Sequence, residues 1–157
     1  MKKSTCIYVI QNGSWLMLRR DRKKNDINEG KYIGVGGKNE PGETFRECAL
    51  REFREETGCE LQDPVFAGFV DFCYDTLEEE RIAVYTSFAM QGTPIPCREG
   101  TLEWVKESEV LQLPLWEGDR IFLKRMIFGI GLPFHLKLVY DDHGTLIRAE
   151  ELEVINE

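Results

Sequence analysis

The sequence predicts a single α/β domain. Strand-like apolar runs precede and follow a central helical segment, and a second helical pattern comes after the later strands. No long linker, repeat or low-complexity segment separates these elements, which favours one domain over residues 1–157. With 157 residues, 42% of them hydrophobic, the chain is long enough to bury a core without disulfides or metal staples.

Two apolar runs, residues 5–10 and 15–20, open the chain. The segment 11–14 between them contains an Asn-Gly pair, which is typical of a tight β-hairpin turn. A third short apolar run, residues 32–35, leads into a glycine-rich loop, residues 34–37, called the glycine loop below. We therefore expect a hairpin followed by a short strand.

Residues 45–57 are predicted to form the central helix. Thr44, followed three residues later by Glu47, is a capping box, and Gly58 is suited to the left-handed conformation that ends a helix. At about 100° per residue, the apolar side chains of this segment fall on one stripe. They are Phe45, Cys48, Ala49 and Phe53.

Three further strands and a helical turn are expected after this helix. Residues 65–74 and 81–90 read as two long strands across the acidic turn 75–80, and residues 102–106 as a shorter strand. Ser108 is placed to cap a brief helical turn.

The last part of the chain predicts a helix and a pair of strands. The helix covers residues 119–128 and ends at Gly129. Residues 134–140 and 146–154 are expected to pair across the polar turn 141–144.

Three carboxylates stand where a helix tolerates them poorly. Glu52 and Glu56 fall inside the apolar stripe and Glu55 lies at its edge, so like charges repel each other near the C-terminal end of the helix. Arg51 is spaced to pair with either Glu47 or Glu55. A solvated acidic helix end is the simpler interpretation. The position of the acids within the stripe favours a bound Mg²⁺, which prefers carboxylate oxygens.

The spacing of this segment resembles the Nudix box, G-x5-E-x7-R-E-U-x-E-E-x-G-U, in which U is a bulky apolar residue. The residues that fill its positions are Gly37, Glu43, Arg51, Glu52, Phe53, Glu55, Glu56 and Gly58, with Cys59 at the last U. The resemblance implies an α/β/α sandwich with a mixed sheet between helices. It also implies hydrolysis of a nucleoside diphosphate linked to another moiety, with Mg²⁺ or Mn²⁺ as cofactor.

The Nudix resemblance assigns roles to the residues of the box. The implied metal ligands are Glu52, Glu55 and Glu56 with the carbonyl of Gly36, supplemented by Glu99. Arg51 is expected to orient the glutamates, and Glu43 to brace the loop or to act through water. Either Glu55 or Glu99 would take a proton from the attacking water. A surface turn is the alternative interpretation of the segment around Glu99.

Other residues are candidates for substrate contacts. Lys38 follows the glycine loop and is placed to meet a phosphate oxygen. The basic cluster of residues 19–24 either neutralises a polyphosphate, with Arg19 or Lys23 as the contact, or is a solvated surface. Trp116 and Asp119 either stack on a nucleobase and bind its edge, or are a core tryptophan beside a helix-capping aspartate.

Longer phrases narrow the resemblance to bacterial Nudix enzymes of the MutT/MutX type, which hydrolyse oxidised purine nucleoside triphosphates such as 8-oxo-dGTP. These phrases cover residues 28–38, 99–104 and 116–120. The wider group includes an enzyme with a base-reading Asn at the position of Ile33, whose side chain cannot make those hydrogen bonds. A nucleoside triphosphate would yield the monophosphate and pyrophosphate. The alternatives are ADP-ribose, a dinucleoside polyphosphate or a capped RNA end as substrate, and a Nudix-fold isomerase or a nucleotide sensor as function.

Composition limits the partners. A net charge of −8 argues against binding a nucleic acid polymer, so a small nucleotide is the expected partner. The five cysteines include no C-x-x-C pair, which is typical of reduced thiols. The short apolar run at the N-terminus predicts neither a signal peptide nor a membrane span, and we expect a cytoplasmic protein. The oligomeric state is left open between monomer and homodimer.

Overall fold

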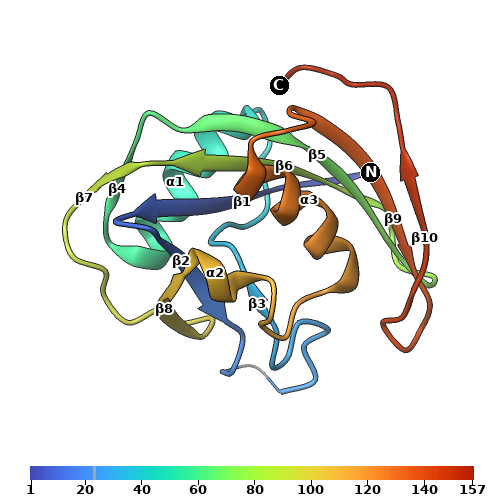
Figure 1. Ribbon diagram of the computed structural model, residues 1–157, viewed down its shortest axis with the longest axis horizontal. Helices are drawn as coiled ribbons and strands as arrows, with labels where there is room; N and C mark the ends of the chain where they lie inside the picture. The colour runs from blue at the N-terminus through green and yellow to red at the C-terminus, as the bar shows by residue number, and fades with distance from the viewer. Residues whose placement is uncertain (23) are drawn as a thin grey trace.

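The structure is a computed structural model that describes residues 1–22 and 24–157 (Figure 1). The strands of the described residues are β1 Lys2–Gln11, β2 Ser14–Arg19, β3 Tyr32–Ile33, β4 Glu60–Gln62, β5 Val65–Tyr74, β6 Glu80–Ser87, β7 Ala89–Gln91, β8 Thr101–Lys106, β9 Phe134–Tyr140 and β10 Leu146–Glu151. The helices are α1 Phe45–Thr57, α2 Glu107–Val110 and α3 Glu117–Phe128.

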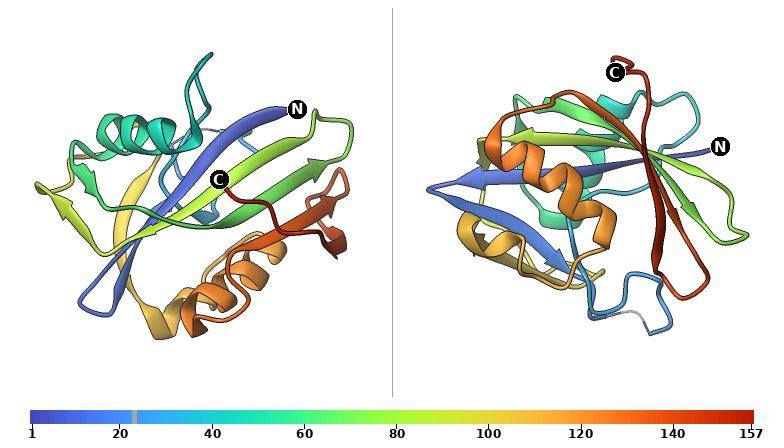
Figure 2. Two further views of the ribbon diagram at one scale, coloured as in Figure 1. Left: turned by 90° about the horizontal axis from the view of Figure 1, so that it is seen from above. Right: turned by 45° about the vertical axis from the view of Figure 1, so that its right-hand side comes forward.

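One mixed sheet organises the molecule. Among the described residues, seven of its strands follow the order β10-β9-β5-β6-β1-β2-β3, and β8 pairs with β2. β1 runs parallel to β6 and β5 parallel to β9, while the other pairs of this sheet are antiparallel. α1 lies on one face of the sheet and α3 on the other (Figure 2). The predicted α/β class, with a mixed sheet between helices, is confirmed.

The predicted hairpin turn is present, but its two strands diverge soon after the turn. Asn12 and Gly13 adopt positive φ angles of 52° and 74° at a two-residue turn, as the Asn-Gly pair predicts. Only the two residue pairs next to the turn join β1 to β2, after which β1 pairs with β6 and β2 with β8. The edge of β1 freed by this divergence receives the glycine loop, through bridges of Ile7 with Val35 and Ser4 with Lys38.

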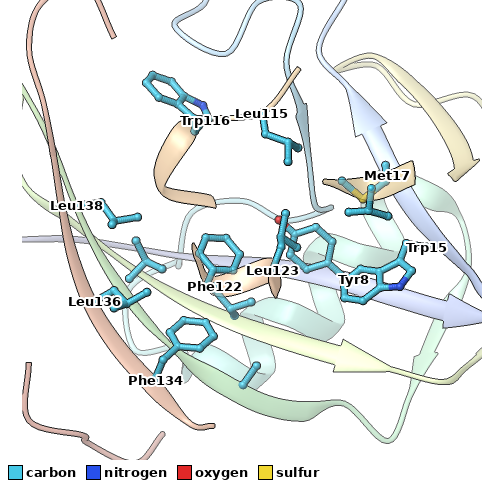
Figure 3. Close-up of a cluster of buried hydrophobic side chains, with 14 of the residues drawn as sticks. Tyr8, Trp15, Met17, Leu115, Trp116, Phe122, Leu123, Phe134, Leu136 and Leu138 are labelled. Atoms are coloured by element: carbon cyan, nitrogen blue, oxygen red, sulfur yellow. The ribbon is translucent and has the colours of Figure 1, made fainter. Parts of the chain in front are cut away.

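A separate core lies on each face of the sheet. Under α1, Ala49 and Phe53 are fully buried against strand residues such as Ile7 and Tyr85. Under α3, Phe122 stacks on Phe134 of β9 with ring centroids 5.4 Å apart (Figure 3). The fold therefore fixes α1 and α3 independently, on opposite sides of the same strands.

Several predicted boundaries differ from the structure. The strand expected at 81–90 is two strands, β6 and β7. They are interrupted at Phe88, and the Ser87 hydroxyl donates to the Ala89 carbonyl across the break. The short strand β4, which pairs with β7, was missed. The interruption lets the chain leave the main sheet and form this small separate ribbon.

The helix ends were only partly predicted. α1 begins and ends as predicted, with both bonds of the Thr44 capping box present. Ser108 lies inside α2 and does not cap it, because the helix begins at Glu107. α3 begins two residues earlier than predicted, with Trp116 at its N-cap, and Gly129 ends it in the left-handed conformation. Asp119 is therefore inside the first turn and is not a capping residue.

Truncating the core side of α1 should destabilise the protein much more than truncating its outer side. Phe53→Ala removes a fully buried ring and should cost about 3–5 kcal/mol of unfolding free energy, since a cavity remains. Leu50→Ala, at an exposed position of the same helix, should change it by less than about 1 kcal/mol. Equilibrium urea unfolding measures both, and similar losses would contradict the packing described for α1.

Candidate active site

The end of α1 carries the three carboxylates of interest. Glu52 has a side chain only 13% exposed, whereas Glu55 at the stripe edge is 49% exposed. Gly58 ends the helix with a φ of 76°, and its N–H donates to the Arg54 carbonyl. The helical spacing therefore holds like charges together at the negative end of the helix dipole, as the sequence predicts.

Arg51 is the cation that makes this arrangement possible. Its guanidinium donates hydrogen bonds to both carboxylate oxygens of Glu43, with Nε–Oε2 at 2.7 Å and Nη2–Oε1 at 2.9 Å. The same group donates to Glu52 at 2.8 Å, to Glu55 at 3.2 Å and to the carbonyl of Lys38 at 3.0 Å. One half-buried charge thus joins the loop before α1 to two of the box glutamates. Of its two expected partners Arg51 takes Glu55, while Glu47 is engaged in the capping box.

Glu52 sits closely against the glycine loop. Burial raises its pKa, the Arg51 guanidinium opposes that rise, and the charges of Glu55 and Glu56 reinforce it. A Cβ at Gly37 would overlap the Glu52 carboxylate, so a larger residue here would displace that carboxylate. The loop and the helix are therefore fitted to each other at the atoms that carry the chemistry.

The backbone of the glycine loop is arranged by β1. The Thr5 N–H donates to the Gly37 carbonyl and the Ile7 N–H to the Val35 carbonyl. Because successive carbonyls of extended backbone alternate in direction, the Gly36 carbonyl between them points away from β1. Gly36 itself lies against the backbone of Thr5 so tightly that a Cβ would overlap its carbonyl. The carbonyl proposed as a metal ligand is thus turned out of the sheet.

A cleft of about 710 Å³ connects the box to the α3 side of the sheet. Eight of the residues singled out from the sequence line it: Gly36, Lys38, Glu52, Glu55, Glu56, Glu99, Trp116 and Asp119. Its remaining wall includes the apolar side chains of Leu18, Ile33, Val70 and Phe72. The structure therefore brings together, in one concave site, residues that lie more than eighty positions apart.

Arg19 and Arg20 of the basic cluster, residues 19–24, have different surroundings in the structure. Arg19 does not line the cleft and pairs instead with Asp21 at 3.2 Å and Glu103 at 3.4 Å. The residue that faces the cleft is its neighbour Arg20, because side chains alternate across a strand. Sequence reasoning missed Arg20, and strand alternation was the signal that could have found it. Lys23 lies outside the described residues.

Arg20 forms ion pairs with two acidic residues that also line the cleft, Glu99 and Asp26. Its guanidinium pairs with Glu99 at 3.1 Å and with Asp26 at 2.7 Å, and all three side chains are largely buried. Glu99 thus lies in the same cleft as the box glutamates. An anionic ligand that reaches Arg20 would compete with two carboxylates.

Trp116 forms part of the cleft wall. Its ring is 3% exposed, its Nε1–H donates to Asn28 Oδ1 at 2.7 Å, and the Lys31 ammonium lies 4.6 Å from the ring centroid. The ring makes edge-to-face contacts with Phe72 and Tyr140 (Figure 3 shows Trp116 at the margin of the α3 core). A base that stacked on the Trp116 face would have to displace Lys31.

Asp119 lies beside Trp116 on the first turn of α3. Burial raises the pKa of its carboxyl group to about 7, and the nearby charges of Arg120 and Lys31 lower it only partly. No hydrogen bond within the part of the chain described in the structure engages this carboxyl group. It is a half-buried polar group that lines the cleft beside Trp116.

The site offers suitable donors for a hard divalent cation. Three carboxylates, a further acid and an outward-turned backbone carbonyl line one end of the cleft, and oxygen donors of this kind suit Mg²⁺ or Mn²⁺. Within residues 1–22 and 24–157, no three acidic, cysteine or histidine side chains already converge as a metal cage. Arg51 holds Glu52 and Glu55, so a cation would take over carboxylates that Arg51 now orients.

Comparison with known proteins places this chain in a family. Residues 1–126 match the NUDIX domain, and the chain therefore belongs to the Nudix family. It is accordingly a hydrolase of phosphoanhydride bonds. Nudix hydrolases generally use divalent metal ions such as Mg²⁺ and act on small-molecule substrates.

Particular relatives refine this placement. The chain is 28% identical over 146 residues to the Nudix hydrolase YvcI of Bacillus subtilis, covering 90% of this chain and 83% of that protein. It is 25% identical over 133 residues to the oxidized purine nucleoside triphosphate hydrolase of Mus musculus, covering 84% of each. The structure resembles the MutT protein of Bacillus halodurans with a TM-score of 0.86 and 26% identity, covering 96% of this chain and 97% of that one. The MutT protein of Methanosarcina mazei gives 0.71 and 27%, covering 83% and 95%. The MutT-type resemblance is thereby confirmed.

The described residues contain no helix with both the length and the apolar character needed to cross a membrane.

The Arg51–Glu43 pair should contribute stability that is lost in acid. Hydrogen bonds from Arg51 lower the pKa of Glu43 to about 2, from an ordinary value of 4.5. The folded state keeps this carboxylate ionised where the unfolded state protonates it, so the contribution is complete above pH 4.5 and is lost as the pH falls toward 2. Glu43→Gln should flatten the pH dependence of unfolding free energy in this window, as measured by urea titrations.

Arg51→Gln is the matched variant for this test. It removes the partner and leaves Glu43 in place, so it should flatten the same window. If only one of the two variants does so, the Arg51–Glu43 pair is not the origin of the acid dependence.

Proposed function

We propose that this protein is a Mg²⁺-dependent nucleoside triphosphate pyrophosphohydrolase that acts on oxidised purine nucleotides, converting 8-oxo-dGTP to 8-oxo-dGMP and pyrophosphate. One observation carries the proposal. A single cleft has the acidic residues of the Nudix box at one end, and an apolar wall with Trp116 and Asp119 at the other. A nucleotide has the same division, with an anionic polyphosphate and a flat, polar-edged base.

The names of the relatives support the choice of substrate. The mouse protein is named as an oxidized purine nucleoside triphosphate hydrolase, and the B. halodurans and M. mazei structures are of MutT proteins. The proposed place of the enzyme is the cytoplasm, where removing oxidised precursors from the nucleotide pool would protect DNA.

The phosphate end has the oxygen donors that would hold a divalent ion. Mg²⁺, or Mn²⁺ in its place, would neutralise charge on the phosphates and acidify a bound water. The residues that would hold it are Glu52, Glu55 and Glu56, with the Gly36 carbonyl and Glu99. Arg51 keeps Glu52 and Glu55 oriented.

The reaction needs a proton acceptor beside the attacking water. The water oxygen forms a bond to one phosphorus of the α–β anhydride, the bridging P–O bond breaks, and the fragment on the other side of that bond leaves with the electron pair, giving the monophosphate and pyrophosphate. A carboxylate takes the proton released by the water, and Glu55 or Glu99 is the candidate. Glu55 is the more exposed of the box glutamates that contact Arg51, while Glu99 reaches the cleft from the opposite wall.

Two cations of the cleft are candidates for the polyphosphate. Lys38 follows the glycine loop, and Arg20, which directly follows β2, lines the cleft. Arg20 replaces Arg19 in this role, because Arg19 is held outside the cleft by acidic partners.

At the base end, Asp119 is the proposed reader of the purine edge. Its carboxyl group can accept hydrogen bonds from ring or exocyclic N–H groups. Ile33 lines the same cleft and supplies apolar contact in place of hydrogen bonds. Trp116 forms the wall beside Asp119.

Nucleotide hydrolysis tests the proposal directly. With Mg²⁺ the wild-type protein should release pyrophosphate from 8-oxo-dGTP with a higher kcat/KM than from dGTP, and chelation should abolish release. Equal rates on the two nucleotides would remove the sanitising role. Preference for ADP-ribose or a dinucleoside polyphosphate would replace the substrate class, and no hydrolysis of any of them would favour a sensor or an isomerase.

Removing one box carboxylate should separate chemistry from folding. Glu52→Gln and Glu56→Gln should each lower kcat by about two orders of magnitude or more, because part of the cation's charge stabilisation is lost. Both should retain the wild-type circular dichroism spectrum. Near-normal activity of either variant with Mg²⁺ would contradict the metal assignment.

Base reading by Asp119 predicts a pH dependence. With its pKa raised to about 7, the group is protonated below and ionised above that pH. Since the ionised form is the better acceptor, kcat/KM for 8-oxo-dGTP should rise as the pH increases through about 7. Asp119→Asn should lack this inflection in initial-rate profiles. An unchanged inflection in the variant would assign it to another group.

A further inference from the structure

Glu56 is the box glutamate that Arg51 does not hold. The Arg51 guanidinium donates to Glu52 and Glu55 on its own side of the helix. Glu56 follows Glu52 by one helical turn, so the two carboxylates repel each other, and its position near the C-terminus of α1 adds to the cost. The orientation of Glu56 must therefore come from another group.

That group is the thiol of Cys97. Its S–H donates to Glu56 Oε2, with sulfur and oxygen 3.0 Å apart. This is the one hydrogen bond that the described residues give the Glu56 carboxylate.

The segment that carries Cys97 is fixed to the end of α1. The Ile95 N–H donates to the Thr57 carbonyl at 2.8 Å. The Ile95 side chain packs over Gly58, where an added Cβ would lie only 3.1 Å from it. Cys97 itself is 2% exposed. The thiol therefore meets Glu56 from a defined direction.

We propose that Cys97 is a positioning residue, whose thiol orients the Glu56 carboxylate for the divalent cation. The S–H engages Oε2, which leaves Oε1 available as a metal donor. This role rests on the proposed function, because it requires that the box glutamates bind a cation.

A thiol suits this position better than a charged donor. An arginine or lysine would neutralise Glu56 and compete with the cation for the carboxylate. The S–H group is neutral and a weak donor, so it fixes the geometry and leaves the negative charge available. Partners that orient metal ligands commonly change metal affinity by about 10–100-fold when removed.

Metal binding by cysteine variants tests the inference. Cys97→Ala removes the donor, and Cys97→Ser keeps a hydroxyl donor at the same place. Cys59→Ala is the control, since Cys59 is a fully buried cysteine at the same end of α1 whose thiol is directed at the Thr57 carbonyl and not at a carboxylate. Mn²⁺ titration followed by electron paramagnetic resonance gives the dissociation constant without substrate, and Mg²⁺ dependence of kcat gives a second readout.

Cys97→Ala should weaken Mn²⁺ binding about tenfold, the lower end of that range because the thiol is a weak donor. It should shift the Mg²⁺ concentration for half-maximal activity in the same direction and leave the KM for nucleotide at saturating metal near the wild-type value. Cys97→Ser should restore binding to within about threefold of the wild type, the spread expected for a single interaction. Cys59→Ala should bind metal as the wild type does.

Three outcomes would overturn the inference: unchanged Mn²⁺ affinity in Cys97→Ala, equal weakening in Cys59→Ala, or no recovery in Cys97→Ser. Failure of the proposed function looks different, because the wild-type protein itself would then neither bind Mn²⁺ nor hydrolyse nucleoside triphosphates. Thermal unfolding of each variant without metal shows whether a loss of affinity is a loss of folding.

Discussion

The mutual repulsion of carboxylates at the end of α1 is the constraint on which the rest of the site depends. A helix places Glu52, Glu55 and Glu56 on neighbouring positions at the terminus where the helix dipole is least favourable to anions. Two chemically different hydrogen-bond donors hold these carboxylates in place. Arg51 holds the first two acids and the loop before the helix, and the neutral Cys97 thiol meets the third. The glycine loop can approach Glu52 because Gly37 has no side chain.

The divergence of β1 from β2 supplies the space in which this chemistry sits. If the hairpin stayed paired along its length, β2 would occupy the edge of β1 that now binds residues 35–39. Arg20, directly after β2, lines the cleft and pairs with both Glu99 and Asp26. The Arg20 charge is therefore already engaged, and an anionic ligand that binds it would exchange one set of ion pairs for another.

Local signals in the sequence were sufficient for α1, the β1–β2 turn and the β5, β8 and β9 strands. Capping boxes, Asn-Gly turns and glycine at a helix end act through neighbouring residues, so they can be read without knowing the fold. The break between β6 and β7, the early start of α3 and the partner of Glu56 depend on tertiary contacts. The cleft that gathers Glu99, Trp116 and Asp119 with the box follows from strand order, which one sequence does not specify. Arg20 was passed over because its neighbour Arg19 was weighed by charge alone, without strand alternation.

The pairing of β5 with β9 has a consequence for the unit that folds. The NUDIX domain match ends at residue 126, within α3, whereas β9 and β10 lie beyond it. Without β9, the strand β5 would become an open edge, and Phe122 of α3 would lose the ring of Phe134 that it stacks on. The matched domain and the packed core therefore have different boundaries in this chain. The last thirty or so residues contribute none of the box, yet they complete the surface on which α3 and its aspartate are held.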